Sequence, residues 1–356
     1  MSTLPLGLLV VIFVAAAAVV WVAGIQLSRA VDVLDARLHL GSALGGLVML
    51  AVATNLPEIA ITVSAAASGN LDVAVGNILG GIALQTVVLV VLDAFGRRGR
   101  GVRSLTHRAA SLSLVLEGIV VVSVLAVVIV GSQLPGGLEV LRLTPDVVLI
   151  AALWIVGLLL VRRAGSHLPW HGEDNAPGTG PRAPRQGGSG PRRRGSTTTM
   201  STRRAAIVFS VAAGATLVAG VVLERAGDAA SSQIGLSGVL FGATVLALAT
   251  SLPQISTGLQ AIRQGDDTLA ISDIFGGNAF LPVLFLMATV ISGSAVLPRA
   301  DGADIYLTAL AALLTLVYVV GLIFRPRRRI LGMGVDSLVV LTLYVLGVGG
   351  LFTIAA

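Results

Sequence analysis

The sequence predicts an all-α polytopic membrane protein with ten transmembrane helices, arranged as two inverted five-helix repeats. The first observation is composition. Of 356 residues, 55% are hydrophobic and 12% are charged, and mean hydropathy is +0.93, whereas soluble domains carry about 25% charged residues. The second is a set of ten apolar segments, each near the roughly 20 residues that cross a bilayer core. The third is a proline-containing phrase present in both halves.

Five apolar segments precede residue 162 and five follow residue 204. The first begins without a preceding basic residue or a small-residue cleavage site, so we interpret it as a span and not as a signal peptide. Residues 1–161 and 205–356 are each expected to form one membrane repeat, with motif regions at 46–93 and 242–290. The predicted spans are 5–27, 40–67, 71–93, 109–131, 144–161, 205–223, 236–262, 269–291, 303–324 and 332–354.

The segment 162–204 is rich in Arg, Pro, Gly and Ser and has almost no large apolar residues. It cannot bury enough surface to offset its ordering entropy, so it is predicted to be a disordered linker. Arginine clusters at 97–108, 162–204 and 325–329 all fall on one side of a ten-span chain. The positive-inside rule makes that side cytoplasmic and places both termini outside a cell (cytoplasmic) membrane. The net charge of +6 therefore reports orientation in the bilayer and not a nucleic-acid partner.

The duplicated phrase is Ala53–Ile59 in the first half and Ala249–Ile255 in the second, an offset of 250 − 54 = 196 residues. Between 46 and 81, 14 of 36 residues match their partners at 242–277 without a gap. An odd number of spans per half makes the two copies insert in opposite orientations. Duplicated, interrupted apolar segments indicate the binding site of a secondary transporter.

Each phrase breaks a helix and leaves oxygen atoms unpaired. Pro57 has no N–H, so the carbonyl of Ala53 loses its helical partner, and Pro253 does the same to Ala249. Backbone left unpaired at membrane depth is tolerated only where protein, water or an ion satisfies it. The neighbouring Thr54, Asn55, Thr250 and Ser251 add hydroxyl and amide oxygens, which suit a hard cation.

Glu58 lies near the middle of the second predicted span, where an ionisable side chain indicates function. The alternative is a protonated glutamic acid bonded to a neighbouring helix. Gln254 occupies the equivalent position and offers an amide oxygen without charge.

Further polar residues lie in the following spans. Asp273 is interpreted either as a second cation ligand or as a charge near the cytoplasmic interface, and Asn77 is its repeat partner. Gln85 lies two turns after Asn77, while its repeat partner is Leu281, which cannot coordinate a cation. Asn278, one turn before Leu281, offers an amide oxygen.

Other intramembrane groups are expected to be structural. Glu117 is expected to pair within the protein. Glycines of the motifs are expected to allow close helix packing; they are Gly76, Gly80, Gly81, Gly276 and Gly277. Four acids near span ends are expected to be solvated; they are Asp93, Glu224, Asp304 and Asp336.

Two phrases in each half carry a family resemblance. The first half reads Ala53-Thr54-Asn55-Leu56-Pro57-Glu58 and Gly76-Asn77-Ile78-Leu79-Gly80-Gly81; the second reads Ala249-Thr250-Ser251-Leu252-Pro253-Gln254 and Ser272-Asp273-Ile274-Phe275-Gly276-Gly277-Asn278. With these motifs the chain resembles the calcium:cation antiporter superfamily, whose best-known branch is the sodium/calcium exchangers. That family carries G-T-S-L-P-E followed by G-N-x-x-G-S-N in each repeat.

The resemblance implies calcium binding by the repeat glutamates, with hydroxyls, carbonyls, amides and acids helping to bind sodium. It also implies a sodium/calcium exchanger-like fold for the two inverted five-helix repeats, and it makes Glu58 the central ligand. The chain departs from the family pattern where Gln254 replaces a glutamate and where Gly81 and Gly277 replace serines. The full candidate set comprises Glu58, Thr54, Asn55, Gln254, Thr250, Ser251, Asn77, Asp273 and Gln85, the carbonyls of Ala53 and Ala249, and the breaks at Pro57 and Pro253.

The sequence therefore predicts a secondary active cation antiporter with alternating access around a midplane site at Glu58. Its partners are inorganic cations (Ca²⁺, Na⁺ or H⁺) and the lipid bilayer, with no cofactor. Two alternatives remain open: a sodium/proton exchanger using one carboxylate, or a transport-inactive ion-binding sensor or scaffold. The sequence shows no nucleophile–base set, which argues against an enzyme, and no signal for an oligomeric state.

Overall fold

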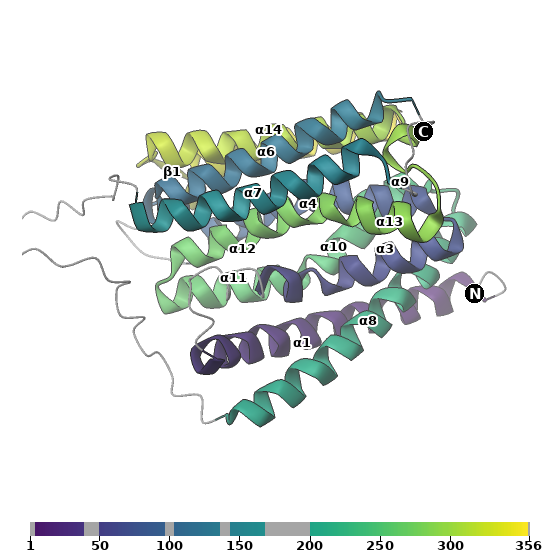
Figure 1. The fold of residues 1–356 in the computed structure, drawn as a ribbon, viewed down its shortest axis with the longest axis horizontal. Helices are drawn as coiled ribbons and strands as arrows, with labels where there is room; N and C mark the ends of the chain where they lie inside the picture. The colour runs from purple at the N-terminus through teal and green to yellow at the C-terminus, as the bar shows by residue number, and fades with distance from the viewer. Residues whose placement is uncertain (1–3, 39–49, 97–102, 136–142, 168–199, 355–356) are drawn as a thin grey trace, which may run out of the picture.

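The long helices run side by side between two ends of one bundle (Figure 1). The structure is a computed structural model that describes residues 4–38, 50–96, 103–135, 143–167 and 200–354. Within these ranges, eight helices are long and apolar enough to cross a membrane, and a ninth span is formed by two helices that meet at a 40° bend. We call the end where α7 (Pro145–His167) stops and α8 (Thr202–Gln233) starts the linker end. Both chain termini lie at the opposite, terminal end (Figure 1).

The remaining elements follow in chain order. They are α1 (Leu6–Leu38), α3 (Leu56–Ser68), α4 (Leu71–Phe95), α5 (Leu105–Ala109), α6 (Leu112–Ser132), α9 (Gly238–Phe241), the π-helix η1 (Gly242–Leu246), α10 (Ala247–Thr250), α11 (Leu252–Gln264), α12 (Asp267–Phe280), η2 (Leu281–Val283), α13 (Leu284–Ser292), η3 (Leu297–Arg299), α14 (Gly302–Phe324), β1 (Arg329–Ile330), β2 (Met333–Gly334) and α15 (Val335–Ile354).

These elements correspond to the predicted spans. The second, predicted at 40–67, is described only from Leu50: residues 50–54 are helical, and α3 follows after a break. Two predicted spans, 5–27 and 205–223, were too short, because α1 continues to Leu38 and α8 runs to Gln233. Helix also enters the predicted linker at 162–167 and 202–204, which corrects its ends; residues 168–199 lie outside the described ranges.

The sequence repeat is also a structural repeat. α3 and α11 both have 13 residues, and they end at Gly69 and Gly265, whose φ angles are 81° and 89°. A left-handed residue that satisfies the last carbonyls ends many helices, and glycine adopts it without steric cost. Gly69 and Gly265 are again 265 − 69 = 196 residues apart. The α3–α4 turn lies at the terminal end and the α11–α12 turn at the linker end, as expected for inverted copies (Figure 1).

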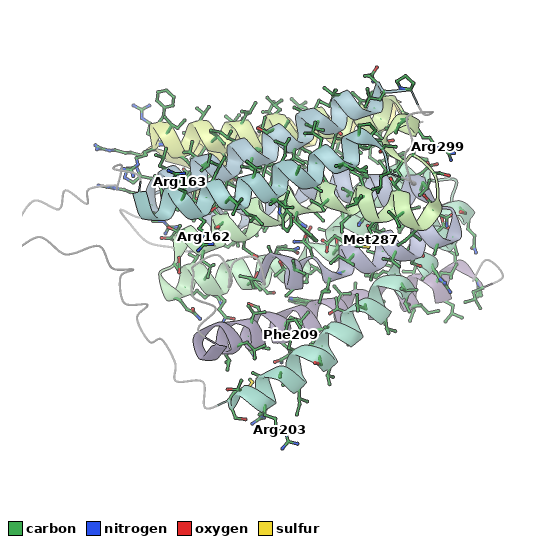
Figure 2. The ribbon with its side chains drawn as sticks, viewed as in Figure 1. Arg162, Arg163, Arg203, Phe209, Met287 and Arg299 are labelled. Carbon is green, nitrogen blue, oxygen red and sulfur yellow. The ribbon has the colours of Figure 1, made fainter. Side chains whose placement is uncertain are left out.

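The first helices of the two repeats, α1 and α8, pack against each other along one side of the bundle (Figure 1). They have 33 and 32 residues, about 50 Å at 1.5 Å per residue, so each exceeds the thickness of a bilayer core of about 30 Å. The large hydrophobic core lies on the other side, mainly among α4, α6, α12 and α14. Figure 2 shows Arg162, Arg163 and Arg203 at the linker end and Arg299 at the terminal end.

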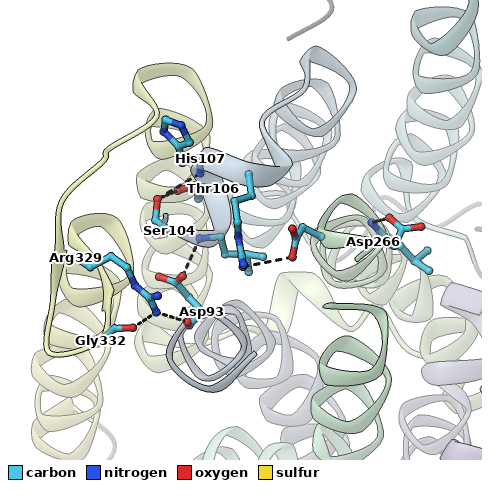
Figure 3. Close-up of polar contacts among 11 residues, drawn as sticks. Asp93, Ser104, Thr106, His107, Asp266, Arg329 and Gly332 are labelled. Atoms are coloured by element: carbon cyan, nitrogen blue, oxygen red, sulfur yellow. Dashed lines mark hydrogen bonds and ion pairs between the residues drawn. The ribbon is translucent and has the colours of Figure 1, made fainter. Parts of the chain in front are cut away.

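The four acids expected to be solvated are buried, so that expectation was wrong. At the linker end, Asp93 accepts hydrogen bonds from the backbone N–H of Leu105 (2.7 Å) and Gly334 (2.6 Å) and from the Ser337 hydroxyl (2.9 Å). Arg329 donates to the carbonyl oxygen of Asp93 at 2.9 Å (Figure 3). This cluster fastens the end of α4 to the α14–α15 connection, and its donors offset the desolvation of the carboxylate.

The other three acids also have hydrogen-bond partners or a capping role. Ser64 of α3 donates to Glu224 of α8 at 2.8 Å, and Asn70 donates to Asp228 at 3.2 Å. These bonds join α8 to the first repeat. Asp304 belongs to the capping box that starts α14, and at the linker end Asp336 accepts from Thr106.

Candidate functional site

The two helix breaks are the frame of the candidate site. Helical geometry is interrupted at Asn55 and at Ser251, and Pro57 and Pro253 lie in the first turns of the helices that follow. The side-chain amide of Gln254 in one break lies 3.3 Å from the carbonyl oxygen of Thr54 in the other. The structure therefore brings the two duplicated phrases together, although they are 196 residues apart in the chain.

Glu58 lies between the breaks and is 0% exposed. Its Oε1 accepts a hydrogen bond from Nε2 of Gln85 at 3.1 Å, and the side chains of Thr250 and Gln254 also lie within hydrogen-bonding reach. Among the described residues, Oε2 has no hydrogen-bond partner. A buried carboxylate oxygen without a donor is costly, and a bound cation or proton would satisfy it.

The hydrogen-bond network around Gln254 favours one orientation of its amide. In that orientation its nitrogen donates to the Thr250 carbonyl at 2.9 Å and its oxygen accepts from Gln85 at 3.2 Å. Ring and amide orientations are assigned from such networks. In this orientation both ends of the amide have partners, and Gln254 links the backbone of its own break to Gln85 of the first repeat.

Asp273 of α12 reaches the site from the linker side. Its Oδ1 accepts from the Thr54 hydroxyl at 3.4 Å, and its Oδ2 accepts from the Thr257 hydroxyl at 3.3 Å. Its side chain is only 6% exposed. Of the two interpretations of Asp273, the structure favours contact with the site, because Thr54 is itself part of the first break. A small crevice of about 20 Å³, lined by Ser28 of α1, Thr257 and Asp273, lies beside it.

One corner of the site is polar, and we define it by Asn55, Gln85 and Gly277. A Cβ at position 277 would lie 2.9 Å from Nδ2 of Asn55 and 3.5 Å from Oε1 of Gln85. Asn55 donates to the Ala51 carbonyl at 2.6 Å. The family pattern quoted above has serine at the positions of both Asn55 and Gly277. In this chain the larger Asn55 occupies the space that Gly277 leaves free.

The symmetry-related corner is apolar, and we define it by Gly81 and Leu281. A Cβ at position 81 would lie 3.6 Å from Cδ1 of Leu281. The offset of 196 relates Gly81 to Gly277 and Gln85 to Leu281. The repeats therefore place a glycine in both corners, but the side chain that faces it is the amide of Gln85 in one and the aliphatic group of Leu281 in the other.

Other candidate ligands contribute less directly. The hydroxyls of Thr250 and Ser251 donate to the Ala247 carbonyl at 3.1 and 2.8 Å, which leaves their lone pairs available. Asn77 is fully buried, and neither atom of its amide has a partner among the described residues. Asn278 donates to Thr86 at 3.1 Å, so it supports α4. Ala53 and Ala249, whose backbone carbonyls are predicted ligands, are both buried.

Gly76 and Gly80 allow the close helix contact expected of the motif glycines, whereas a Cβ at Gly81 or Gly276 would make only ordinary contacts at 3.6 and 3.9 Å. A Cβ at Gly76 would lie 2.8 Å from the Val239 carbonyl oxygen, and one at Gly80 would overlap Ala243. Both contacts involve the region of α9 and the π-helix η1, which the sequence analysis did not identify. π-Helical turns often lie at functional sites.

A second pair of glycines was missed although the repeat offset points to it. Gly24 of α1 lies against Pro253, since a Cβ there would be 2.5 Å from the Pro253 Cβ. Gly220 of α8, 220 − 24 = 196 residues later, lies against the first break, and a Cβ there would be 3.1 Å from the carbonyl oxygen of Pro57. Each first helix therefore covers the break of the other repeat.

Comparisons with known proteins agree with this architecture. The family model described as "Sodium/calcium exchanger protein" matches residues 8–163 and 204–353. The putative antiporter CaxA of Alkalimonas amylolytica is 26% identical over 291 residues, covering 79% of this chain and 80% of the relative. The inner membrane protein YrbG of Escherichia coli (strain K12) is 25% identical over 264 residues, covering 73% of this chain and 72% of the relative.

Solved structures show the same fold. The H⁺/Ca²⁺ exchanger CAX superposes with a TM-score of 0.66 at 15% identity, covering 97% of this chain and 82% of its own. The sodium-calcium exchanger NCX_Mj, soaked with Na⁺ and Sr²⁺, superposes with a TM-score of 0.60 at 15% identity, covering 97% and 99%.

Proposed function

This chain belongs to the sodium/calcium exchanger protein family and is a multi-pass membrane cation antiporter, not an enzyme; we propose that it exchanges calcium for sodium ions or protons at one site centred on Glu58. The observation that carries the proposal is the meeting of two inverted helix breaks around this carboxylate. Solved relatives of the same fold are named for exchange of calcium with protons or sodium.

The charge of the site supports a divalent substrate. Calcium takes six to eight oxygen ligands, and its affinity follows the charge of those ligands. Gln254 removes one of the family's two carboxylates, but Asp273 contacts Thr54 from the other side of the break. We propose that Glu58 and Asp273 supply two negative charges, and that Thr54, Asn55, Asn77, Gln85, Thr250, Ser251 and Gln254 supply neutral oxygens. The carbonyls of Ala53 and Ala249 complete the set.

The way α1 and α8 cover the breaks supports alternating access. At the terminal end, α8 is held to α3 by the bond between Ser64 and Glu224, while the crevice beside Asp273 lies toward the linker end. We propose that this arrangement is the state open to the linker side. Movement of α1 and α8 over Pro253 and Pro57 would close that side and open the other.

The arginine distribution supports one orientation in the membrane. Arg162, Arg163 and Arg203 lie at the linker end (Figure 2), so by the positive-inside rule we propose that this end is cytoplasmic and that the termini are extracytoplasmic. In a cell membrane the described state would face the cytoplasm.

A second candidate, sodium/proton exchange, is favoured by Gln254, which leaves Glu58 as the one acid in the duplicated phrases. The discriminating measurement is ion flux in proteoliposomes with calcium-sensitive and pH-sensitive dyes. Our proposal expects calcium flux driven by a sodium or proton gradient. Sodium/proton exchange without calcium flux would favour the second candidate, and no counterflow of any cation would favour an ion-binding sensor.

The assignment of Glu58 is tested in the same assay. Glu58→Ala removes the central carboxylate and is expected to abolish coupled flux. Asp72→Asn removes an exposed acid at the start of α4 and is the matched control, expected to retain it. Coupled flux in Glu58→Ala equal to that of the control would refute a Glu58-centred site.

Two glycines of α8 allow a controlled test of its movement. A methyl group at Gly220 would lie 2.7 Å from the Ala60 Cβ, whereas one at Gly214 on the same helix meets nothing within 4 Å. Gly220→Ala is therefore expected to slow transport with little change in cation affinity, and Gly214→Ala is expected to leave the rate unchanged. Equal rates in the two variants would contradict movement of α8 over the first break.

A further inference from the structure

The connection between α14 and α15 contains a β-hairpin with an unusual tip. The strands β1 and β2 pair in antiparallel register, which leaves Leu331 and Gly332 at the turn with φ angles of 55° and 85°. Two-residue turns with positive φ at both central residues favour Asn-Gly or Asp-Gly, because other side chains crowd the backbone there. Leu331 is also 82% exposed. Neither packing within the protein nor the preference of the turn accounts for a leucine at this position.

The hairpin is fastened to the rest of the linker end. The Asp93 carboxylate accepts from the backbone N–H of Gly334 at 2.6 Å, and Arg329 donates to the Asp93 carbonyl at 2.9 Å (Figure 3). Just before the hairpin, the Ser104 hydroxyl donates to the carbonyl of Pro326 at 2.8 Å. These bonds fix the position of the tip relative to the helices.

The residues around the tip combine positive charge with apolar side chains. Arg327 and Arg328 are exposed, and within the described ranges neither has a hydrogen bond or an ion pair. Phe324 and Ile330, nearby in the chain, are 78% and 45% exposed. Residues 324–335 include no acid that could neutralise the arginines. We call residues 324–332 the basic–apolar segment.

The helices that it joins place this segment at the membrane surface. Both α14 and α15 are long and apolar enough to cross a bilayer, so their connection lies where the spans leave it. α15 packs mainly against α14 and α4 and is otherwise exposed, so lipids are expected to surround this side of the bundle. At such a surface, apolar side chains favour the acyl chains, and arginines favour the level of the headgroups.

We propose that the basic–apolar segment is a lipid anchor that binds anionic phospholipids of the adjacent leaflet. Leu331 inserts among the acyl chains, and Arg327 and Arg328 bind the headgroup phosphates. Transfer of Leu331 into lipid offsets the unfavourable backbone conformation of the tip. Because Asp93 ends α4, which also carries Gln85, the anchor holds the linker end of that helix at one depth in the bilayer. The proposal rests on neither calcium transport nor the Glu58 site.

The depth of the tip can be measured at one labelled position, since the chain has no cysteine. Leu331→Cys carrying a bimane fluorophore is studied in the full-length protein in nanodiscs. Phospholipids with a nitroxide high on the acyl chain are expected to quench it strongly. Thr268→Cys, exposed near the α11–α12 turn at the same end, is the matched control and is expected to be quenched several-fold less. Equal quenching of the two labels would place the tip in water, available to a soluble partner, and would overturn the proposal.

The preference for anionic headgroups is tested with the label at position 331. Nitroxide-labelled phosphatidylglycerol is expected to quench it at lower mole fraction than phosphatidylcholine with the same nitroxide, by about fivefold for each arginine that binds a headgroup. Arg327→Gln with Arg328→Gln should remove this preference. Arg203→Gln with Arg204→Gln removes the same charge from exposed residues at the linker end (Figure 2) and should keep it. Equal quenching by the two lipids while both hairpin arginines are present, or the same loss in both double variants, would overturn the proposal.

Discussion

The polar corner and the apolar corner of the ion site are built on the same backbone, yet they offer a cation different surroundings. In the polar corner, Gly277 leaves space that Asn55 and Gln85 fill with amide groups. In the apolar corner, Gly81 leaves space that Leu281 fills with a methyl group. The duplicated frame thus keeps a glycine in both corners but places an amide beside only one of them. We infer that cations bind asymmetrically, toward the first repeat.

The largest loss of cation affinity is expected when the polar corner is made apolar. Gln85→Leu copies the residue at the equivalent position 281 and removes the donor to Glu58 as well as an amide oxygen. We expect cation binding to weaken by about 1.5–3 kcal/mol, or about 10- to 150-fold in Kd. Isothermal titration measures it, with thermal unfolding as a check on the fold. Unchanged affinity would show that the two corners are equivalent for binding.

Because Asn55 fills the space beside Gly277, substitutions at these two positions should have non-additive effects on stability. Gly277→Ser adds a Cβ that would lie 2.9 Å from Nδ2 of Asn55, and overpacking of this kind is expected to cost about 2 kcal/mol of stability. Adding Asn55→Ser should recover most of the loss. A double-mutant cycle on the midpoint of thermal unfolding measures the coupling, and additive effects would rule out shared space.

The missing carboxylate of the second break can be restored. Gln254→Glu adds a charged ligand beside Glu58 and is expected to strengthen calcium binding about tenfold, or about 1.4 kcal/mol. Isothermal titration with calcium is the measurement, and Gln254→Met, which is similar in length and uncharged, is the control for side-chain volume. No gain, or a loss, would count against a site derived from calcium binding.

The smallest effect is expected in the apolar corner. Leu281→Met conserves volume and polarity, so stability should change by less than about 1.5 kcal/mol and cation affinity should stay the same. Titration and thermal unfolding of this variant provide the baseline for Gln85→Leu. A large loss of affinity would show that Leu281 contributes to cation binding after all.

The frame of the site could be predicted from sequence because it depends on local chemistry. Prolines and glycines determine where helices break and end, and the offset of 196 residues carried Pro57, Pro253, Gly69 and Gly265 into equivalent places. The spans followed from hydropathy in the same way. The positions of Glu58 and Gln254 follow directly from these breaks.

The contacts between distant residues could not be predicted in this way. In the sequence Asp93 has the position of a solvated acid at a span end. In the structure it is buried and accepts hydrogen bonds from α5 and α15. The interpretation of Asp273 was open until α12 was placed beside Thr54. The fit of Asn55 against Gly277 depends on a spacing of helices that sequence does not contain. The contacts of Gly24 and Gly220 were accessible in part, since their offset of 196 was visible in the chain.

The central claim is that a cation binds between the two breaks at Glu58, and ion anomalous diffraction tests it most directly. Crystals of the full chain soaked with Sr²⁺ in place of Ca²⁺ should show a peak about 2.3–2.6 Å from a carboxylate oxygen of Glu58, nearer to Gln85 than to Leu281. A peak in the apolar corner, or strontium bound only away from both breaks, would contradict the account.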